Sequence, residues 1–211
     1  MNTDITPFQI AIPESDLDDL RTRLEHTRWP ESEVVDDWTQ GIPLSYLKEV
    51  CDYWKTSYNW RTVEKRLNAL PQYTTKIDGL DVYFIHIRSS NEDARPLLLT
   101  HGWPGSVIEF LKVIGPLTEP VQYGASEAES FHLVIPALPG FGFSEKPSKT
   151  GWSVDKIARA WSELMLRLGY TKYLAQGGDW GAAITASIGA QDPEHCIGSV
   201  SYTHLTLPTK A

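Results

Sequence analysis

Cysteine is scarce in this chain of 211 residues, which carries only Cys51 and Cys196. Two cysteines are too few for a disulfide framework, and they lack the spacing of metal ligands, so we expect free thiols in a reducing, cytoplasmic compartment. The sequence also lacks any run of about 18 apolar residues, the length that a membrane helix needs. Its beginning, MNTDITPFQI, has neither the basic start nor the apolar core of a signal peptide. We therefore expect no membrane anchor.

Positive charge is in deficit, because 19 Lys and Arg face 27 Asp and Glu and give a net charge of −8. This balance argues against nucleic acid as a partner. The sequence contains no phosphate loop, no dinucleotide fingerprint and no cluster of metal ligands, so we expect neither a cofactor nor a metal ion. The stretch GFGFS looks like a glycine-rich loop, but it lies between PALP and a Lys-Pro turn. With 41% apolar and 22% charged residues the composition is that of a globular protein.

Tryptophan is concentrated near the N-terminus, where four of the eight lie between positions 29 and 60. Leucines spaced by three and four residues predict an amphipathic helix over 14–27, after Pro13. Similar apolar stripes predict further helices from residue 44 and over 60–70. We interpret residues 1–75 as a helical extension whose core is too small to stand alone. Its tryptophans are expected to be packing anchors rather than a binding site.

The apolar period changes from helical to alternating at Gln72. Asp78-Gly79 between two alternating runs predicts a β-hairpin. Buried strands are expected at 95–100, 131–137 and 172–176, and helices at 106–115 and 153–168, the latter capped by Ser153 and ended by Gly169. Strands that alternate with helices predict an α/β fold with a mainly parallel sheet covered on both faces, here over residues 76–198.

Glycine-flanked Asp179 follows one of these strands, in the sequence Gly177-Gly178-Asp179-Trp180-Gly181. This is the form of a nucleophile elbow, a tight strand-to-helix turn with small residues on either side of the nucleophile. A carboxylate is already ionised at pH 7 and can attack carbon without an activating base. The alternative interpretation is that Asp179 merely caps the following helix.

A second loop, His101-Gly102-Trp103-Pro104-Gly105, follows the strand at 95–100. In an elbow architecture one oxyanion donor is the N–H after the nucleophile, here that of Trp180, and the other comes from an earlier strand's loop, here Trp103. Both loops follow the carboxyl ends of strands, where ligands bind in such sheets.

These motifs resemble the epoxide hydrolases of the α/β-hydrolase fold, in the branch with an N-terminal extension shared by microsomal and fungal enzymes. The resemblance runs from Pro7 to Gly198 and is carried by IPESDLDDLRTRLEHTRWP, NALPQYTTKIDGLDVYFIHIRS, HGWPGS, ALPGFGFSEKP and QGGDWGA. It implies that Asp179 attacks a small apolar epoxide to form an ester, which a histidine-activated water hydrolyses to a vicinal diol. Detoxification is the implied role, and a homo-oligomer stays open.

The resemblance also assigns supporting residues. It implies a cis peptide at Trp103-Pro104 and makes His101 an organiser of its loop rather than the catalytic base. Phe141 and Phe143 are expected either to line the apolar pocket or to pack in the core.

The acid and base that complete the family's triad have no counterpart in this sequence. The candidates after the nucleophile are Asp192, Glu194, His195 and His204. The first three lie at the end of the elbow's own helix, about 20 Å from the nucleophile, which is too far for a relay. Residues 199–211, which include His204, do not resemble the family, whose members continue into a lid with two tyrosines that bind the epoxide oxygen. We therefore interpret the chain as truncated or frame-shifted and expect no turnover from it.

Three alternatives stay open. A haloalkane dehalogenase-like hydrolase also places an Asp nucleophile before Trp, although the tryptophan-rich extension favours the epoxide hydrolases. A non-catalytic fragment that binds apolar ligands is the second alternative, and a partial gene product without a function of its own is the third.

Overall fold

The structure, a computed structural model, describes residues 4–202 and divides them into two compact units. One unit is helical and comprises residues 10–69; the other contains residues 4–9 and 70–202. The elements, in chain order, are β1 (Ile5–Pro7), α1 (Glu14–Glu25), α2 (Leu44–Thr56), α3 (Trp60–Asn68), β2 (Gln72–Ile77), β3 (Leu80–Ile87), β4 (Arg95–Thr100), η1 (Val107–Phe110), α4 (Ile114–Thr118), η2 (Pro120–Tyr123), η3 (Glu127–Glu129), β5 (Phe131–Pro136), α5 (Val154–Arg167), β6 (Tyr173–Gly178), α6 (Trp180–Gln191) and β7 (Cys196–Tyr202).

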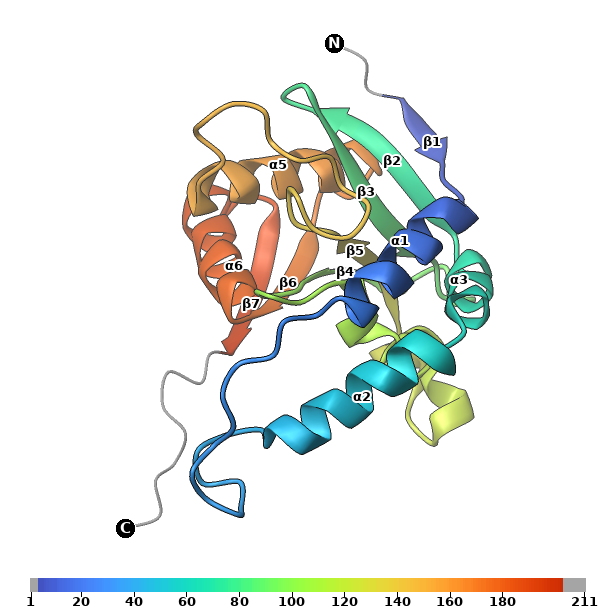
Figure 1. Cartoon of the computed structure of the whole chain (residues 1–211). Coiled ribbons are helices and arrows are strands. Elements are labelled where there is room, and N and C mark those ends of the chain that lie inside the picture. The colour runs from blue at the N-terminus through green and yellow to red at the C-terminus, as the bar shows by residue number, and fades with distance from the viewer. Residues whose placement is uncertain (1–3, 203–211) are drawn as a thin grey trace. The chain divides into compact units, whose positions relative to one another are not determined.

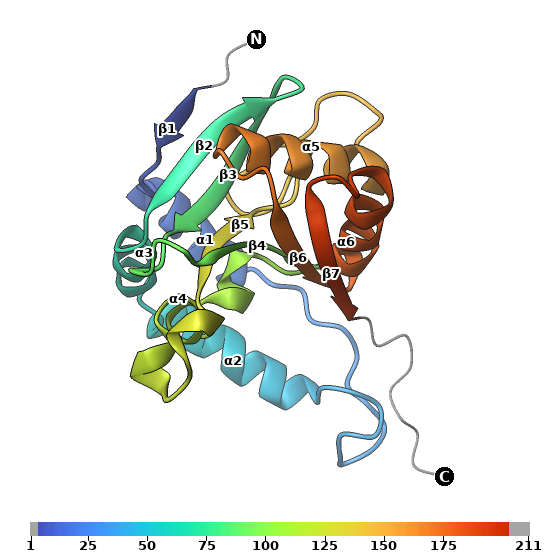
Figure 2. The same cartoon turned by 180° about the vertical axis from the view of Figure 1, so that it is seen from behind.

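The larger unit is built on a seven-stranded sheet of order β1-β2-β3-β5-β4-β6-β7 (Figure 1). The strands β5, β4, β6 and β7 pair in parallel, as the alternation of strands and helices predicts. β1, β2 and β3 extend this half with antiparallel pairs, and β3 joins it antiparallel to β5. In the view from behind, β7 lies beside β6 at the outer edge of the parallel half (Figure 2).

The predicted hairpin joins β2 and β3. Asp78 and Gly79 form its two-residue turn with φ values of 51° and 83°, both in the left-handed region. That combination matches the right-handed twist of paired strands and is adopted most easily by Asp-Gly and Asn-Gly. The prediction is confirmed.

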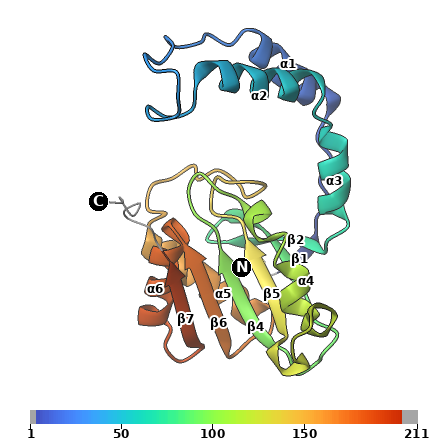
Figure 3. The same ribbon diagram turned by 90° about the horizontal axis from the view of Figure 1, so that it is seen from below.

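Two apolar clusters cover the two faces of the sheet. Neighbouring residues of β3 alternate between them, because Phe84 belongs to the cluster under α5 and α6 while Ile85 belongs to the other. Successive strand residues point to opposite faces, so the two clusters are separated by the sheet. The second cluster packs against η1 and α4, while α5 and α6 pack together on the first face (Figure 3).

Helix α5 has the predicted boundaries. The Ser153 hydroxyl accepts the Lys156 N–H at 3.3 Å, and Gly169 leaves the helix with φ 85°. The apolar stripe is buried, with Trp161 and Leu164 both 0% exposed. Together with α6, this helix therefore covers the face of the sheet that carries the first apolar cluster.

The prediction of a single helix over 106–115 is wrong. The structure has a short 3₁₀ helix, η1, followed by α4, which begins at Ile114. Pro116 explains the break, because proline has no N–H to donate and its ring clashes with the carbonyl four residues earlier in a continuous helix. A new helix that begins two residues before Pro116 avoids both penalties.

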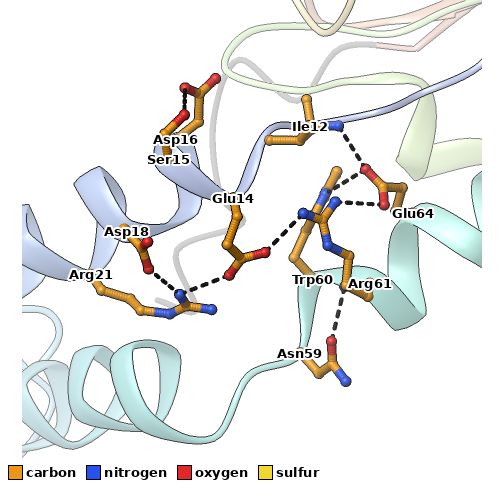
Figure 4. A network of polar contacts seen from close by, with 10 residues as sticks. All are labelled: Ile12, Glu14, Ser15, Asp16, Asp18, Arg21, Asn59, Trp60, Arg61 and Glu64. Carbon is orange, nitrogen blue, oxygen red and sulfur yellow. Dashed lines mark hydrogen bonds and ion pairs between the residues drawn. The ribbon is translucent and has the colours of Figure 1, made fainter.

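The helical unit contains the three predicted helices, α1, α2 and α3. An ion-pair network ties α1 to α3, because Arg61 contacts Glu14 at 2.9 Å and Glu64 at 2.8 Å (Figure 4). Glu14 also accepts from Arg21 at 3.0 Å, and Glu64 accepts the backbone N–H of Ile12 at 2.8 Å. The ion pairs of Glu14 are exposed, so they fix geometry more than they add stability, whereas the Glu64 side chain is only 13% exposed.

The structure divides the chain elsewhere than at the predicted boundary after residue 75. Residues 5–7 and 72–77 are strands of the sheet, so the helical unit is shorter at both ends than the predicted extension. At the other end, 199–202 lie within β7, while the remainder of the predicted tail, with His204, lies outside the described residues. Of the described helices, none combines the length and apolar character that crossing a membrane requires.

Candidate active site

Asp179 lies at the turn between β6 and α6 in a strained backbone conformation. Its φ of 54° and ψ of −125° fall in a region that a residue other than glycine rarely adopts. Its N–H donates to the Tyr202 carbonyl at 3.1 Å, which ties the turn to β7. The side chain makes no helix-capping hydrogen bond, so the alternative interpretation of Asp179 as a cap has no support. The turn therefore leaves the carboxylate available to the loop after β4.

Gly177 and Gly181 are required by the close crossing of the chain at this turn. A Cβ at Gly177 would overlap the backbone of Gly181, and a Cβ at Gly181 would overlap the carbonyl of Thr100. Both collisions are with backbone atoms, which cannot rotate away as the end of a side chain can. The small residues of the motif thus have a steric cause in the structure.

The other two motif glycines differ from each other. A Cβ at Gly102 would lie 2.5 Å from the Asp179 Cβ, so glycine is needed where the two loops meet. At Gly178 the nearest atom to a Cβ would be the Tyr202 carbonyl oxygen at 3.4 Å, an ordinary contact. Gly178 is therefore the least constrained of the four.

The loop after β4 delivers a hydrogen-bond donor to the Asp179 carboxylate. The Trp103 N–H donates to Oδ1 at 2.8 Å. This bond, together with the N–H of Trp180, lowers the pKa of Asp179 below its usual value, because both donors favour the charged form. The two donors assigned from the sequence thus act on the same carboxylate. The Trp103-Pro104 peptide is cis, as expected, and the Trp103 side chain is exposed.

His101 is fully buried and engaged at both ring nitrogens. Nε2 accepts the Leu138 N–H at 3.1 Å, so the proton lies on Nδ1, which donates to the Gly102 carbonyl at 2.9 Å. Burial lowers the pKa of His101, in keeping with a neutral ring. Phe141 packs edge-on against the imidazole at 5.9 Å. His101 therefore joins the loop after β4 to the loop after β5 and has no nitrogen free to act as a base.

Two hollows meet at Trp103, and the smaller one contains the Asp179 carboxylate. The first, of about 460 Å³, is lined by Gly102, Trp103, Pro104, Gly105, Glu109, Gly178, Asp179 and Tyr202. The second, of about 820 Å³, is mostly apolar, and its lining includes Trp103, Phe141, Trp152, Ile157, Trp180 and Ile184. Trp103 lines both hollows, so the apolar space begins next to the polar one.

Of the two phenylalanines considered from the sequence, Phe141 lines the apolar hollow. Phe143 instead packs in the core, against Tyr83 at 5.3 Å and Phe8 at 5.6 Å.

Asp192 and His195 contact each other, but they lie at the opposite end of the strand from Asp179. The His195 carbonyl accepts the N–H of Tyr173, the first residue of β6, whereas Asp179 follows the last. Six strand residues span about 20 Å, so this pair cannot serve as a relay. His86 and His132 lie on β3 and β5 next to Tyr170, and His101 is engaged. Within the part of the sheet unit that the structure describes, no histidine is placed to activate water at Asp179.

Comparisons with known proteins show the family to which this chain belongs. The family model for the epoxide hydrolase N terminus matches residues 5–110, and the model for the alpha/beta hydrolase fold matches residues 95–203. The chain belongs to the epoxide hydrolases of the α/β-hydrolase fold. A Stigmatella aurantiaca protein named as an epoxide hydrolase is 53% identical over 97% of this chain and 46% of its own length. Epoxide hydrolase 1 of Sus scrofa is 38% identical over 92% of the chain and 44% of its own length.

Solved epoxide hydrolases have the same fold. The juvenile hormone epoxide hydrolase of the silkworm Bombyx mori superposes with a TM-score of 0.86 at 33% identity, over 99% of this chain and 49% of that one. The Aspergillus niger enzyme gives 0.82 at 32% identity, over 99% of this chain and 54% of that one. This epoxide hydrolase chain thus spans about half the length of the relatives that it matches.

Two groups at the site were missed by the sequence interpretation. Glu109 lines the hollow beside Asp179. The Tyr202 carbonyl accepts a hydrogen bond from the Asp179 N–H. The Ser106-x-x-Glu109 spacing is the signal of a capping box and indicates a role for the glutamate at a helix start. The Tyr202 contact has no such signal, because it arises from strand pairing. The described residues include no group of three or more side chains able to hold a metal ion.

Proposed function

We propose that Asp179 is the nucleophile of an epoxide hydrolase that forms and then hydrolyses an ester. One carboxylate oxygen attacks an epoxide carbon, the carbon–oxygen bond of the ring breaks, and the released alkoxide takes up a proton. Water then attacks Cγ of Asp179, and collapse of the tetrahedral intermediate releases a vicinal diol. Any lid donors and the base that activates this water would lie outside the described residues.

The observation that carries this proposal is the hydrogen bond from the Trp103 N–H to Oδ1 of Asp179. An oxygen held by backbone donors is suited to be the carbonyl oxygen of the ester, because its negative charge in the second step is then stabilised in place. The other oxygen is left to attack the epoxide. The same donors keep the carboxylate ionised, which an unassisted nucleophile requires.

The apolar hollow supports an apolar substrate. A small epoxide that reacts at Asp179 can extend past Trp103 into the space lined by Phe141 and Trp180. Removing its hydrocarbon surface from water favours binding by roughly 25 cal/mol per Å².

Trapping of the ester tests the proposal. The purified 211-residue chain is incubated with styrene oxide, and intact-mass measurement with peptide mapping locates the adduct. We expect one adduct per chain on Asp179, none in Asp179→Asn, and accumulation without multiple turnovers, because no histidine is placed near the ester within the described part of the sheet unit. Modification that persists in Asp179→Asn, or halide release from 1-chlorobutane without epoxide opening, would contradict it.

A further inference from the structure

The loop that carries the Trp103 N–H is held at its far end by Glu109. Glu109 Oε1 accepts the Ser106 N–H at 3.2 Å, and the Ser106 hydroxyl accepts the Ile108 N–H at 3.3 Å. These reciprocal bonds form a capping box at the start of η1. Between them and Trp103, the Gly105 N–H donates to the Gly102 carbonyl at 2.9 Å and closes the turn.

Glu109 is folded back over this turn rather than extended into solvent. A Cβ placed on Gly105 would overlap the Glu109 carboxylate, so the carboxylate lies directly against the loop backbone. Glu109 is exposed and also lines the hollow that contains Asp179. The Glu109 side chain is therefore held against the backbone of the loop that carries Trp103.

The two ends of the loop are held differently. At the near end, His101 bonds to the Gly102 carbonyl and to the Leu138 N–H. At the far end, the capping box holds Ser106, and the neighbouring Val107 is buried in the second apolar cluster. Trp103 lies between them, so the direction of its N–H depends on both anchors.

We infer that Glu109 is a positioning residue for the reaction at Asp179, acting through Ser106 and Gly105 to aim the Trp103 N–H at the carboxylate. The inference rests on the proposed function for its chemical consequence, although the geometry that it describes does not. What matters is the reach of the side chain to the Ser106 N–H, not its charge.

The chain supplies a matched control. Ser126 and Glu129 form a second capping box, with Glu129 Oε2 accepting the Ser126 N–H at 2.9 Å. It begins η3, which precedes β5 and therefore lies at the amino end of the parallel strands, opposite to Asp179. Its loss should cost similar stability without touching the site.

The first measurement is the pKa of Asp179 from a ¹³C NMR titration of its carboxylate, assigned with Asp179→Asn. Glu109→Ala and Glu109→Asp, the latter charged but too short to reach Ser106, should raise this pKa toward its usual value. Glu109→Gln, which keeps an acceptor oxygen, and Glu129→Ala should leave it unchanged or, for the neutral glutamine, slightly lower. Thermal melts of all four variants identify any that does not fold.

The second measurement is the rate at which hydroxylamine cleaves the styrene oxide ester, a reaction that passes through the same oxyanion. We expect about tenfold slower cleavage in Glu109→Ala and Glu109→Asp and a rate within about twofold of the parent in Glu109→Gln. An unchanged pKa in folded Glu109→Ala, or a glutamine variant as impaired as the alanine, overturns the inference. If the parent chain forms no ester, the proposed function fails, while the titration still tests Glu109.

Discussion

Trp103 and Asp179 are separated by 76 residues, yet a hydrogen bond of 2.8 Å joins them. The strand register explains the contact, because Thr100 at the end of β4 pairs with Gly177 near the end of β6. Because β4 and β6 are parallel neighbours, both end at the same edge of the sheet, and the loops that follow them meet there. The Trp103 donor and the Asp179 carboxylate thus need only the pairing of β4 with β6 and a short loop from each strand.

The depressed pKa of Asp179 predicts the pH profile of ester formation. Because the N–H groups of Trp103 and Trp180 stabilise the carboxylate, it stays ionised below the usual pKa of an aspartate. We expect the rate of alkylation by styrene oxide to reach half its neutral-pH value only below about pH 3.9, the usual pKa of an aspartate. Initial rates measured by mass spectrometry over this range check the profile. A rate that already halves at or above about pH 3.9 would be inconsistent with donors that lower this pKa.

Glycine replacements should separate close chain crossings from ordinary helix positions. Gly177→Ala and Gly181→Ala each force a Cβ into backbone atoms, so we expect a loss of about 2 kcal/mol or more in the free energy of unfolding. Gly189→Ala, in the same helix α6 as Gly181, meets only the Ser199 hydroxyl at 3.4 Å and should be neutral or stabilising by up to about 1 kcal/mol. Urea unfolding of the three variants measures the difference. Equal effects at Gly181 and Gly189 would refute the steric explanation.

The apolar hollow predicts a dependence on substrate size. Trp152 lines it, so Trp152→Ala should weaken the binding of a large epoxide more than that of a small one. We expect the styrene oxide concentration for half-maximal alkylation to rise about fivefold, with little change for propylene oxide. Trp38→Ala, an exposed tryptophan of the helical unit, is the control. A similar rise in the half-maximal concentration of both epoxides would mean that the phenyl ring of styrene oxide does not bind against Trp152.

Local chemistry made much of the sheet unit predictable. The Asp78-Gly79 turn, the Ser153 cap, the Gly169 stop and the glycine-flanked elbow each depend on a few adjacent residues. The elbow motif also implies a loop from an adjacent strand next to the nucleophile position, and the Trp103 N–H contacts Asp179 in the structure. Sequence patterns are informative where short-range sterics and capping decide the structure.

The remainder depends on partners that are distant in sequence. Ile5–Pro7 becomes a strand because β2 offers it an edge, and three residues carry too short a pattern to reveal this. The Tyr202 carbonyl reaches Asp179 through the pairing of β7 with β6. The break in the predicted helix at 106–115 follows from Pro116, which lies beyond that range. None of these outcomes can be derived from periodicity alone.

The partly buried histidine His86 predicts how stability changes with acid. Burial lowers the pKa of His86 from 6.5 to about 4, with the charges of Arg88 and His132 acting in the same direction. As the pH falls below about 6.5, His86 is protonated in the unfolded chain but stays neutral in the folded protein. Stability present at neutral pH is therefore lost between about pH 6.5 and 4. The full shift corresponds to about 3 kcal/mol.

Urea unfolding at a series of pH values checks this loss. His86→Leu should flatten the decline, leaving the part due to His101, whose pKa burial also lowers. Because the slope depends on the difference in bound protons between the two states, it isolates His86 even if the leucine variant is itself less stable. Equal slopes for the parent and His86→Leu would mean that the folded protein binds the proton as readily as the unfolded chain.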